Sequence, residues 1–263
     1  MQVNGKRVVL TGAAGGMGRI LAAELKEKGA TLALVDANAD ALHQVAAELQ
    51  GAHPVAGDLS SAEGCRIACD ECRELLGGID LLINLAGINS FAAYEDEDPD
   101  KIELMMRVNL LAPMWMARAI LPTMQEQNSG RIVNVGSIFG SIGFAYFTTY
   151  STTKFGLRGF SEALRRELAD TNIKVTYIAP RAVKTPMNSN AIIKMGEATK
   201  MNMDTPEEVV KKIVAAINND RKDIYFGFPE TLFVRLNVMF PRLVDKILAA
   251  QNRIARKFAK GGQ

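Results

Sequence analysis

A tyrosine and a lysine stand four positions apart in the run Tyr150-Ser151-Thr152-Thr153-Lys154. On a helix, this spacing places both side chains on one face. Free tyrosine has a pKa of about 10 and free lysine of about 10.4. An ammonium beside a phenol favours the phenolate, so we expect Lys154 to lower the pKa of Tyr150. The pair predicts a general acid or base that acts on a substrate oxygen.

A glycine-rich stretch, TGAAGGMG at residues 11–18, stands between a strand-like run and a helix-like run. Glycines let the backbone turn tightly and approach a pyrophosphate, while the helix that follows offers free N–H groups and the positive end of its dipole. A flexible turn would show glycines too, but its position between a strand and a helix favours a dinucleotide site.

The second strand-like run ends in Asp36, about 20 residues after the glycines, the distance typical of a residue that binds the adenosine ribose. A carboxylate there accepts hydrogen bonds from the ribose hydroxyls and repels a 2′-phosphate. Neither the glycine-rich stretch nor the position after Asp36 contains Lys or Arg. The pattern therefore favours NAD over NADP. The alternative is that Asp36 only begins a turn or caps the next helix.

Short apolar runs alternate with longer amphipathic stretches along the chain. The runs predict buried parallel strands at Val8–Thr11, Thr31–Val35, His53–Gly57, Leu81–Leu85, Arg131–Gly136, Lys174–Ala179 and Ile224–Phe226. The stretches predict helices at about Gly16–Lys28, Ala39–Gln50, Ser61–Leu76, Lys101–Gln127, Tyr150–Ala169 and Pro206–Asn219. This alternation predicts an α/β fold, a Rossmann-type doubly wound parallel sheet, in which ligands bind beyond the carboxyl ends of the strands. We expect a single dinucleotide-binding and catalytic domain over residues 1–226, with a C-terminal helical extension over 227–263.

Further polar residues follow the predicted strands in a fixed order. Asp58-Leu59 follows the third strand, Asn84-Leu85-Ala86-Gly87 the fourth, Asn109 stands in Val-Asn-Leu, Ser137 follows the fifth strand, and Pro180-Arg181 with Thr185 follow the sixth. With the glycine-rich stretch and Tyr-x-x-x-Lys, this ordered set over roughly residues 5–226 resembles the short-chain dehydrogenase/reductase family.

The resemblance implies an oxidoreductase whose catalytic residues are Asn109, Ser137, Tyr150 and Lys154. It implies that Ser137 holds the substrate oxygen, that Lys154 also binds the nicotinamide ribose, and that Asn109 positions a water between Lys154 and solvent. In oxidation Tyr150 would remove the alcohol proton, and in reduction it would return it. The implied NAD-binding residues are Thr11, Gly12, Gly16, Met17, Gly18, Asp36, Asp58, Leu59, Asn84, Ala86, Gly87, Tyr150, Lys154, Pro180, Val183 and Thr185.

Two positions depart from the family pattern. Leu85 replaces an asparagine, which affects how the fourth strand is tied down, and Arg181 replaces a glycine beside the nicotinamide. Two interpretations of Arg181 stay open: it reaches the pyrophosphate or an anionic substrate group, or it points to solvent.

The cysteines Cys65, Cys69 and Cys72 share one face of a predicted helix. A metal or redox site is one interpretation, but no fourth ligand is apparent and neither His43 nor His53 completes a set. The spacing favours packing of small apolar side chains against the sheet, and we expect no metal.

Apolar residues near the catalytic set predict the walls of a substrate pocket. They are Ile138, Phe139, Phe144, Phe147, Met187 and, within 191–203, Ile192, Ile193, Met195, Met201 and Met203. The segment 191–203 is either a lid over an apolar substrate or part of the core.

The C-terminal stretch after Phe228 is apolar and then basic, with Arg242, Lys246, Arg253, Arg256, Lys257 and Lys260 opposed by Asp245. The apolar residues Leu243, Val244, Ile247, Leu248, Ile254 and Phe258 recur at near-helical spacing. This pattern fits a basic amphipathic helix on an anionic membrane. It equally fits a helix packed on the domain or on a second copy of the chain.

Composition restricts the function classes. The 263 residues are 48% hydrophobic and 23% charged, as in a globular enzyme, and the net charge of +2 gives no case for nucleic acid. No secretion signal precedes the first strand, and no apolar run approaches the roughly 20 residues of a membrane-spanning helix. We expect a cytoplasmic protein or one lying on a membrane surface, forming a homodimer or homotetramer.

These features favour an NAD-dependent dehydrogenase or reductase of a lipophilic secondary alcohol or ketone, such as a steroid-like, retinoid-like or fatty-acyl compound. One alternative is a 3-oxoacyl carrier-protein reductase, against which the preference for NAD argues. A dinucleotide-sensing protein without activity is the other, and the complete set of Asn109, Ser137, Tyr150 and Lys154 argues against it.

Overall fold

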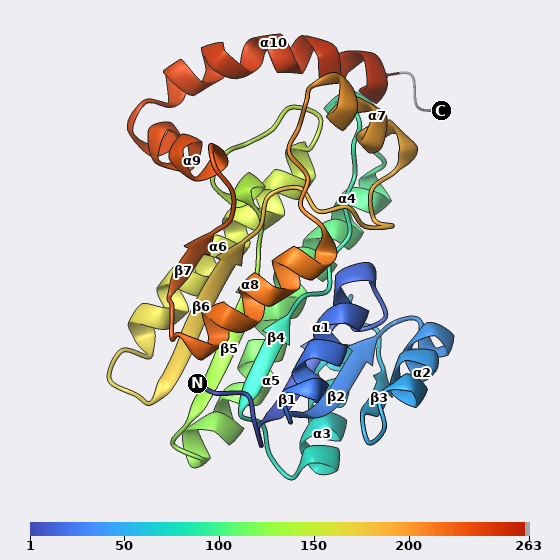
Figure 1. Ribbon diagram of the computed structural model, residues 1–263, viewed down its shortest axis with the longest axis vertical. Coiled ribbons are helices and arrows are strands. Elements are labelled where there is room, and N and C mark those ends of the chain that lie inside the picture. The colour runs from blue at the N-terminus through green and yellow to red at the C-terminus, as the bar shows by residue number, and fades with distance from the viewer. Residues whose placement is uncertain (261–263) are drawn as a thin grey trace.

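The structure, a computed structural model, describes residues 1–260. Within them, seven parallel strands form one sheet in the order β3-β2-β1-β4-β5-β6-β7 (Figure 1). The strands are β1 (Arg7–Thr11), β2 (Thr31–Asp36), β3 (His53–Ala56), β4 (Leu81–Asn84), β5 (Gly130–Val135), β6 (Ile173–Ala179) and β7 (Asp223–Tyr225). Because β1 pairs with both β2 and β4, the strand order reverses there. Such a reversal opens a crevice beyond the carboxyl ends of the strands.

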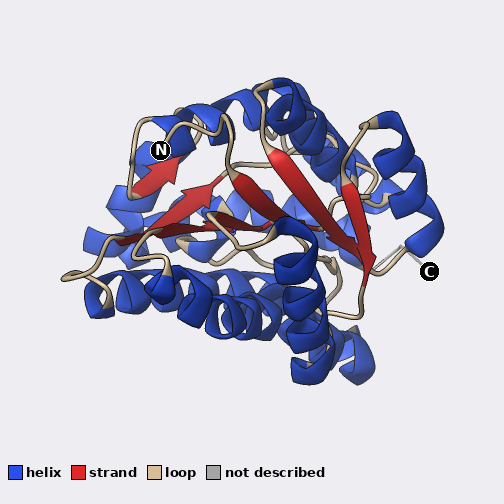
Figure 2. Cartoon of the chain, turned by 90° about the horizontal axis from the view of Figure 1, so that it is seen from below, coloured by secondary structure: helices blue, strands red, loops and turns tan. Residues whose placement is uncertain are grey.

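Helices cover both faces of the sheet (Figure 2). Strand side chains alternate between two cores: Val8 and Leu10 face a core shared with α1, α2 and α8, and Val9 faces one shared with α3, α5 and α6. These helices are α1 (Gly16–Glu27), α2 (Ala39–Glu48), α8 (Pro206–Asn218), α3 (Ala62–Leu76), α5 (Ala112–Glu126) and α6 (Thr148–Glu167). The predicted doubly wound α/β fold is therefore confirmed.

One predicted helix is interrupted. The stretch expected as Lys101–Gln127 consists of α4 (Pro99–Met106), a π-helical segment η2 (Arg107–Leu111) and α5. A π segment bulges the backbone and is often found at functional sites. The segment contains Asn109, whose side chain bonds to Ile88 in a loop distant along the chain, a contact that hydrophobic periodicity does not reveal.

This interrupted helix also corrects an expectation about membranes. Within the described residues, Pro99–Glu126 is long and apolar enough to cross a membrane by length and composition. The expectation rested on the absence of a long uninterrupted apolar run, whereas in this helix polar residues stand among the apolar ones. Its buried side chains Met116, Ile120 and Met124 pack in the core with α3 and the sheet, which is the behaviour of a core helix.

The remaining elements gather beyond the carboxyl ends of the strands. Two 3-10 turns, η1 (Tyr94–Asp96) and η3 (Ile138–Gly140), lie in loops, and α7 (Asn190–Ala198) lies within the segment proposed as a lid. After β7 come α9 (Glu230–Met239) and α10 (Pro241–Ala259), drawn in red at one end of Figure 1. The buried side chains Val234 and Val244 pack on η3, and Ala255 packs beside α7.

The helical extension therefore covers the end of the sheet at which ligands are expected. The division of the chain at residue 226 stays a prediction, and residues 261–263 of the proposed extension lie outside the described residues.

Candidate active site

The glycine-rich loop forms a tight cradle between β1 and α1. Gly12 has a φ of +71°, and a Cβ atom there would lie 2.7 Å from the Cα atom of Ala86. A Cβ atom on Gly18 would overlap the carbonyl oxygen of Gly12. Within the described residues, no side chain caps the start of α1. The backbone N–H groups at this helix start are thus available to an anion, and the residues present fit a pyrophosphate.

Asp36 stands at the end of β2, beside this loop. Its Oδ2 atom accepts a hydrogen bond from the backbone of Ala14 at 3.0 Å, and its Oδ1 atom accepts one from Asn38 at 3.0 Å. Asn38, rather than Asp36, caps α2 by accepting from Ala41. The carboxylate therefore fixes the loop, and ribose binding by it stays a prediction.

A cation that the sequence interpretation did not consider also lies beside the loop. Arg19, on the first turn of α1, donates from Nε to the carbonyl oxygen of Ala14 at 3.0 Å. Ala14 is thus held by Asp36 through its N–H group and by Arg19 through its carbonyl group. The absence of Lys and Arg from residues 11–18 argued for NAD. Because Arg19 lies beside this loop in the structure, that argument is weakened.

Thr11 and Asn84 tie the strands together at the switch point. The Oγ1 atom of Thr11 accepts from the backbone N–H groups of Leu85 at 3.1 Å and Ala86 at 3.2 Å. The buried amide of Asn84 donates to Asn134 at 2.8 Å. These contacts fasten the end of β4 to β1 and β5, although Leu85 itself brings no polar side chain. The predicted cofactor contacts of Thr11 and Asn84 are not tested.

The other predicted cofactor residues lie around the same crevice. Asp58 accepts two hydrogen bonds from Ser60, which hold the pKa of its carboxyl below its usual range. Thr185 lies close to Gly16, since a Cβ atom on that glycine would be 3.5 Å from the Cβ atom of Thr185. Met17 packs partly against the core, Leu59 is buried, and Pro180 accepts from the N–H group of Ile138 at 2.9 Å. Val183 pairs with Asp204 in an isolated bridge.

Asn109 lies in the π-helical segment and is fully buried. Its side chain accepts from the N–H group of Ile88 at 2.8 Å, and it donates to the carbonyl oxygen of Ile88 at 2.8 Å and to Thr153 at 3.2 Å. A Cβ atom on Gly87 would lie 3.2 Å from the Asn109 oxygen and 3.6 Å from Lys154 Nζ. Asn109 and Lys154 therefore converge beside Gly87, and the predicted water between them stays a prediction.

Tyr150 and Lys154 lie in the first half of α6. Lys154 Nζ is 5.6 Å from the centroid of the Tyr150 ring and donates to the carbonyl oxygen of Val135 at 3.3 Å. Ser137 follows β5 and caps η3 by accepting from Phe139 at 3.1 Å. The structure thus brings Ser137, Tyr150 and Lys154 together at the carboxyl end of β5.

The prediction that Lys154 lowers the pKa of Tyr150 is wrong when only the groups of the protein itself act on it. Burial raises the pKa of Tyr150 to about 12, while its hydrogen bond with Ser137 acts in the opposite direction. Burial also lowers the pKa of Lys154 to about 8. Desolvation disfavours both the phenolate and the ammonium, and it outweighs their mutual attraction. Tyr150 therefore holds its proton at neutral pH and is poised as an acid.

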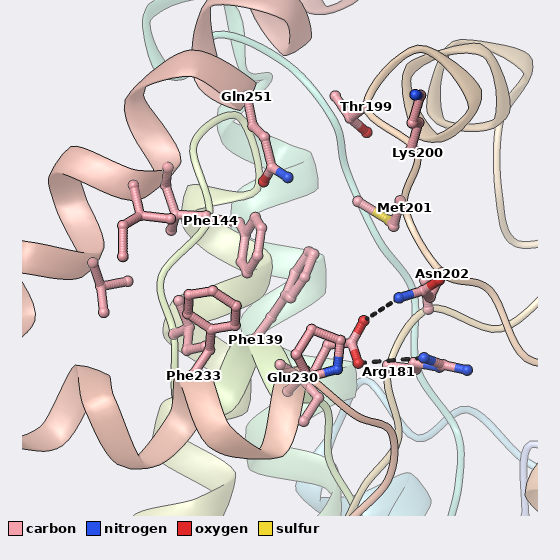
Figure 3. A pocket seen from close by; sticks show the side chains of 17 residues that line it. Phe139, Phe144, Arg181, Thr199, Lys200, Met201, Asn202, Glu230, Phe233 and Gln251 are labelled. Carbon is pink, nitrogen blue, oxygen red and sulfur yellow. Dashed lines mark hydrogen bonds and ion pairs between the residues drawn. The ribbon is translucent and has the colours of Figure 1, made fainter.

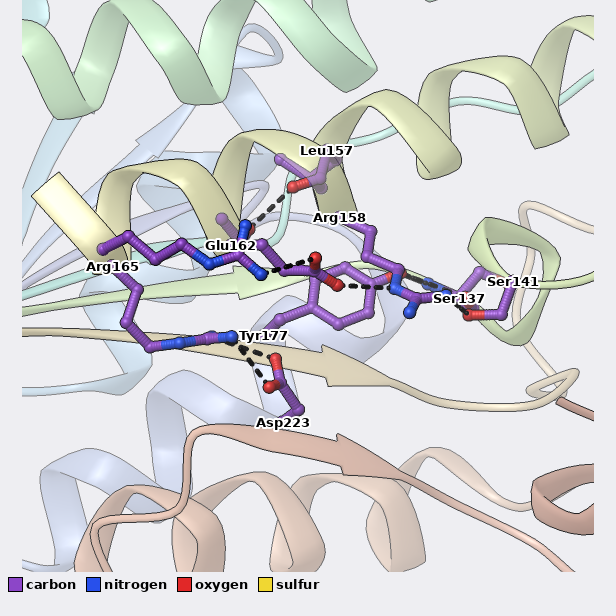
Figure 4. A network of polar contacts seen from close by, with 10 residues as sticks. Ser137, Ser141, Leu157, Arg158, Glu162, Arg165, Tyr177 and Asp223 are labelled. Carbon is purple, nitrogen blue, oxygen red and sulfur yellow. Dashed lines mark hydrogen bonds and ion pairs between the residues drawn. The ribbon is translucent and has the colours of Figure 1, made fainter. Parts of the chain in front are cut away.

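A second tyrosine, which the sequence analysis did not single out, contacts the backbone of Ser137 from strand β6 (Figure 4). Tyr177 on β6 is fully buried; its hydroxyl donates to the carbonyl oxygen of Ser137 at 3.2 Å and accepts from the N–H group of Ser137 at 3.5 Å. Nearby, Arg158 donates to Ser141 and to Glu162, both at 2.9 Å. A phenol among the buried residues Val175–Ala179 of β6 was the available signal for this support.

We predict that Tyr177→Phe lowers kcat about fivefold without changing the Kd for the cofactor. The variant loses the hydroxyl that holds the Ser137 backbone, a hydrogen bond worth about 1 kcal/mol. Steady-state kinetics checks this, with Tyr94→Phe as the control because Tyr94 is exposed on the surface. A lower melting temperature with unchanged kcat would give Tyr177 a purely structural role.

An apolar cavity of about 260 Å³ lies beside η3, the turn that follows Ser137 (Figure 3). Four of the predicted wall residues line it: Ile138, Phe139, Phe144 and Met201. Phe147, Ile192 and Met195 instead pack in a core cluster behind it, whereas Met187 and Ile193 are exposed. The segment 191–203 thus contributes both core and cavity wall. The stacked rings of Phe139 and Phe144 line the cavity, and the Phe139 ring centroid is 6.0 Å from that of Tyr150.

The sequence analysis missed the walls that come from the helical extension. Pro229, Glu230, Phe233, Val244, Ile247, Leu248 and Gln251 line the cavity. These residues lie about 100 positions after Ser137 in the chain, and no motif marks them. They reach the site because α9 and α10 fold back over η3.

Arg181 neither reaches toward an anionic ligand nor points to solvent, the two interpretations left open by the sequence. Its guanidinium pairs with Asp204 at 2.6 Å and with Glu230 at 3.3 Å, and Glu230 also accepts from Asn202 at 3.1 Å (Figure 3). Two carboxylates from distant segments neutralise it, so it is neither a free cation nor a solvent-facing side chain. Arg181 therefore joins the end of β6 to α9 at one side of the cavity.

The cysteines pack α3 against the sheet, as expected. Cys65, Cys69 and Cys72 are buried in one core cluster. Burial raises the pKa of the Cys65 and Cys72 thiols to about 12. These thiols remain protonated at neutral pH, which suits packing rather than metal ligation.

Comparison with known proteins decides the family. The sequence model described as short chain dehydrogenase matches residues 6–196. The chain belongs to the short-chain dehydrogenase family. Dehydrogenase/reductase SDR family member 7B of Bos taurus is 31% identical over 267 residues, which cover 95% of this chain and 82% of that protein. 3-Ketodihydrosphingosine reductase of Bos taurus is 33% identical over 227 residues, which cover 80% and 68%.

Solved structures agree with the fold of this short-chain dehydrogenase. A family member from Burkholderia phymatum in complex with NAD superposes with a TM-score of 0.84 at 22% identity, covering 93% of this chain and 96% of that one. Another from Burkholderia cenocepacia J2315, in complex with NADP, gives a TM-score of 0.81 at 25% identity, covering 94% and 99%. The chain is therefore an oxidoreductase of a family that uses nicotinamide dinucleotides, and both cofactors occur among its structural neighbours.

Proposed function

We propose that this oxidoreductase transfers a hydride between NAD(H) and a lipophilic secondary alcohol or its ketone. The observation that carries the proposal is the convergence of Ser137, Tyr150 and Lys154 at the carboxyl end of β5, with an apolar cavity lined by Ile138, the residue that follows Ser137. The family supplies the reaction class, and the cavity supports an apolar substrate.

The chain's own residues account for binding the cofactor. The loop at residues 11–18 would hold the pyrophosphate through backbone N–H groups, Asp36 would accept from the adenosine ribose, and Asp58 with Leu59 would flank the adenine. Ala86, Gly87, Lys154, Pro180, Val183 and Thr185 would surround the nicotinamide half. When bound, NAD(H) supplies or accepts the hydride.

The chain's residues manage the proton. In reduction, the Ser137 hydroxyl donates a hydrogen bond to the ketone oxygen and orients it toward Tyr150. The phenol of Tyr150 would give its proton to that oxygen as the carbonyl carbon accepts a hydride, and the alcohol would leave. Lys154 would then return a proton to the phenolate, and Asn109 would position the water that resupplies Lys154 from solvent. Because burial keeps the pKa of Tyr150 high, the phenol is protonated at neutral pH, as a proton donor to the ketone oxygen must be.

Two observations favour a lipophilic carbonyl compound. The cavity walls are mostly aliphatic and aromatic, including Phe139, Phe144 and Phe233. A relative at 33% identity is named for a 3-ketodihydrosphingosine, and another at 32% identity is a ketoacyl reductase of Nostoc. The experiment is to supply NADH with a series of ketones of increasing chain length. We expect kcat/KM to rise with chain length, and equal rates across the series would contradict an apolar substrate.

The cofactor preference rests on Asp36. We predict that the protein binds NADH more tightly than NADPH, and that Asp36→Ala weakens NADH about tenfold while tightening NADPH. A hydrogen bond to a charged group is worth about 1.5–3 kcal/mol, and the carboxylate repels a 2′-phosphate. Fluorescence titration of both reduced cofactors measures it.

The control is Asp36→Asn, which removes the charge but keeps an acceptor for the N–H group of Ala14. It should tighten NADPH as Asp36→Ala does and lose less affinity for NADH. If the unaltered protein prefers NADPH, the proposal of NAD is wrong. Loss of that preference in Arg19→Ala would then identify Arg19 as the partner of the phosphate.

The ionisation of Lys154 predicts a pH profile. Burial lowers the pKa of Lys154 to about 8, and only the ammonium can bind the ribose as a cation and supply a proton. We therefore expect kcat/KM for NADH, which reports the free enzyme, to fall as the pH rises through about 8. Kinetics between pH 6 and about pH 10 tests this.

Lys154→Arg provides the comparison, because a guanidinium keeps its charge throughout this range. Its residual activity should show no decline near pH 8. A wild-type profile that stays flat to pH 9.5, about a unit below the free lysine value, would show that Lys154 is not the titrating group.

We also propose that the protein is a homodimer or homotetramer in the cytoplasm or at a membrane surface. The exposed apolar side chain of Phe155 on α6 supports an interface between copies of the chain, and the exposed apolar side chains of the extension support a membrane surface. Sedimentation velocity measures the oligomeric state.

A further inference from the structure

The corner between α9 and α10 exposes large apolar side chains to solvent. The side chains of Phe228, Val238, Met239 and Phe240 are 79%, 67%, 69% and 54% exposed. The others are Leu232, Leu243 and Ile247, at 47%, 49% and 44%. We call these seven residues the apolar corner. They lie at the far end of the molecule, beyond the carboxyl ends of the strands (Figure 1).

Basic residues accompany the apolar corner. Residues 231–260 contain seven Lys or Arg residues and one acidic residue, Asp245, although the whole chain has a net charge of only +2. Arg235, Arg242 and Lys246 are exposed within the corner, and Arg253, Arg256 and Lys257 extend the charge along α10. Exposed cations surrounding exposed apolar side chains match a surface that is anionic outside and apolar beneath.

The same two helices form one wall of the apolar cavity. Val244 and Leu248 turn inward from α10, while Ile247 both lines the cavity and is 44% exposed. Phe233 and Pro229 line it from α9 and the segment before it. The apolar corner and the cavity are therefore continuous through Ile247.

We propose that the apolar corner docks on an anionic lipid bilayer and opens the cavity to it, so that a lipophilic substrate passes from the membrane to Ser137. The passage of substrate rests on the proposed function, whereas the docking does not. A protein partner would have to match the shape of the corner. A bilayer requires only that apolar side chains and cations lie on one side, which they do here.

The test is sedimentation with vesicles of phosphatidylcholine containing about one third phosphatidylserine, compared with vesicles of phosphatidylcholine alone. The full chain is used, because truncation after Phe228 would also remove cavity walls. We expect binding to anionic vesicles at low salt, and at least tenfold weaker binding to neutral ones, since each basic residue adds attraction to an anionic surface. A chain that stays in the supernatant with both overturns the proposal.

Paired variants separate the two contributions. Val238→Glu with Met239→Glu should reduce vesicle binding at least tenfold, whereas Ile67→Glu, on the exposed face of α3, should not. Arg242→Glu with Lys246→Glu should abolish the preference for anionic lipid, and Lys211→Glu with Lys222→Glu is its matched control. Equal effects of test and control variants contradict docking through this corner.

A tryptophan placed at the corner reports insertion directly. The chain has one tryptophan, Trp115, which packs against the core on α5. Met239→Trp should add fluorescence that lipids brominated on their acyl chains quench, with Trp115 unaffected. Quenching should persist at high salt once the side chain is inserted.

A second copy of the chain could cover the apolar corner instead of a bilayer. Sedimentation velocity without lipid detects such an oligomer. If Val238→Glu with Met239→Glu dissociates an oligomer and the parent protein ignores vesicles, the corner is a subunit interface and the proposal is wrong. None of these measurements involves turnover. A protein that binds vesicles but no nicotinamide cofactor would therefore refute the proposed function and leave the docking intact.

Discussion

Replacing Tyr150 with phenylalanine is expected to lower kcat by about a thousandfold while leaving the affinity for NADH unchanged. A positioned acid or base contributes about 10²–10⁴-fold to the rate, and phenylalanine removes the only proton at this position. The ring remains, so its edge-to-face contacts with Phe139 and Phe147 are retained. Steady-state kinetics with NADH and the best ketone of the series, together with fluorescence titration of NADH, measures both quantities.

Tyr94→Phe is the matched control, because it makes the same chemical change on the exposed side chain of η1. It should leave kcat within about twofold, as surface substitutions usually do. If Tyr150→Phe retains near-normal turnover, another group transfers the proton, and the role assigned to Tyr150 must be abandoned.

Gly18→Val is expected to weaken binding of NADH and NADPH by more than a hundredfold. Even a Cβ atom at this position would overlap the carbonyl oxygen of Gly12 and press on Ala13, so the loop must open. An opened loop cannot present its N–H groups to a pyrophosphate, and several charge-assisted hydrogen bonds of about 1.5–3 kcal/mol each are lost. Fluorescence titration measures the change, and circular dichroism verifies that the sheet still forms.

Gly143→Ala provides the comparison. A Cβ atom on Gly143 meets nothing within 4 Å, so its cofactor affinity should be that of the parent protein. A folded Gly18→Val protein that binds NADH normally would show that the loop is not the dinucleotide site.

The strands and the residues that follow them could be predicted because their causes are local. Buried parallel strands need continuous apolar runs, and β1, β4 and β5 occur where those runs stand. Once the strands are placed, Ser137 after β5 and Asp36 at the end of β2 must lie at one edge of the sheet.

Features that depend on contacts between distant segments could not be predicted. Arg181 is neutralised by Asp204 and Glu230, which lie 23 and 49 positions away. Asn109, in the π-helical segment, is held by hydrogen bonds with Ile88, across 21 positions. Neither partnership leaves a periodic signal in the sequence.

The prediction that the pKa of Tyr150 is lowered failed for a different reason. The sequence shows the neighbour that would lower it, Lys154, but not the burial that raises it. Burial also disfavours the charge of Lys154 itself, which reduces the effect of that neighbour. The same limitation applies to Arg19, whose position beside Ala14 becomes visible only in three dimensions.

The most direct test of the central claim follows the hydride. The protein is incubated with NADH carrying two deuterium atoms at C4 of the nicotinamide and with the series of lipophilic ketones, and the extracted alcohol is analysed by mass spectrometry. We predict an alcohol that carries one deuterium at the carbinol carbon, formed by the parent protein and lost in Tyr150→Phe. Binding of neither NADH nor NADPH, with no label in any alcohol of the series, would contradict the assignment of this chain as an active hydride-transfer enzyme.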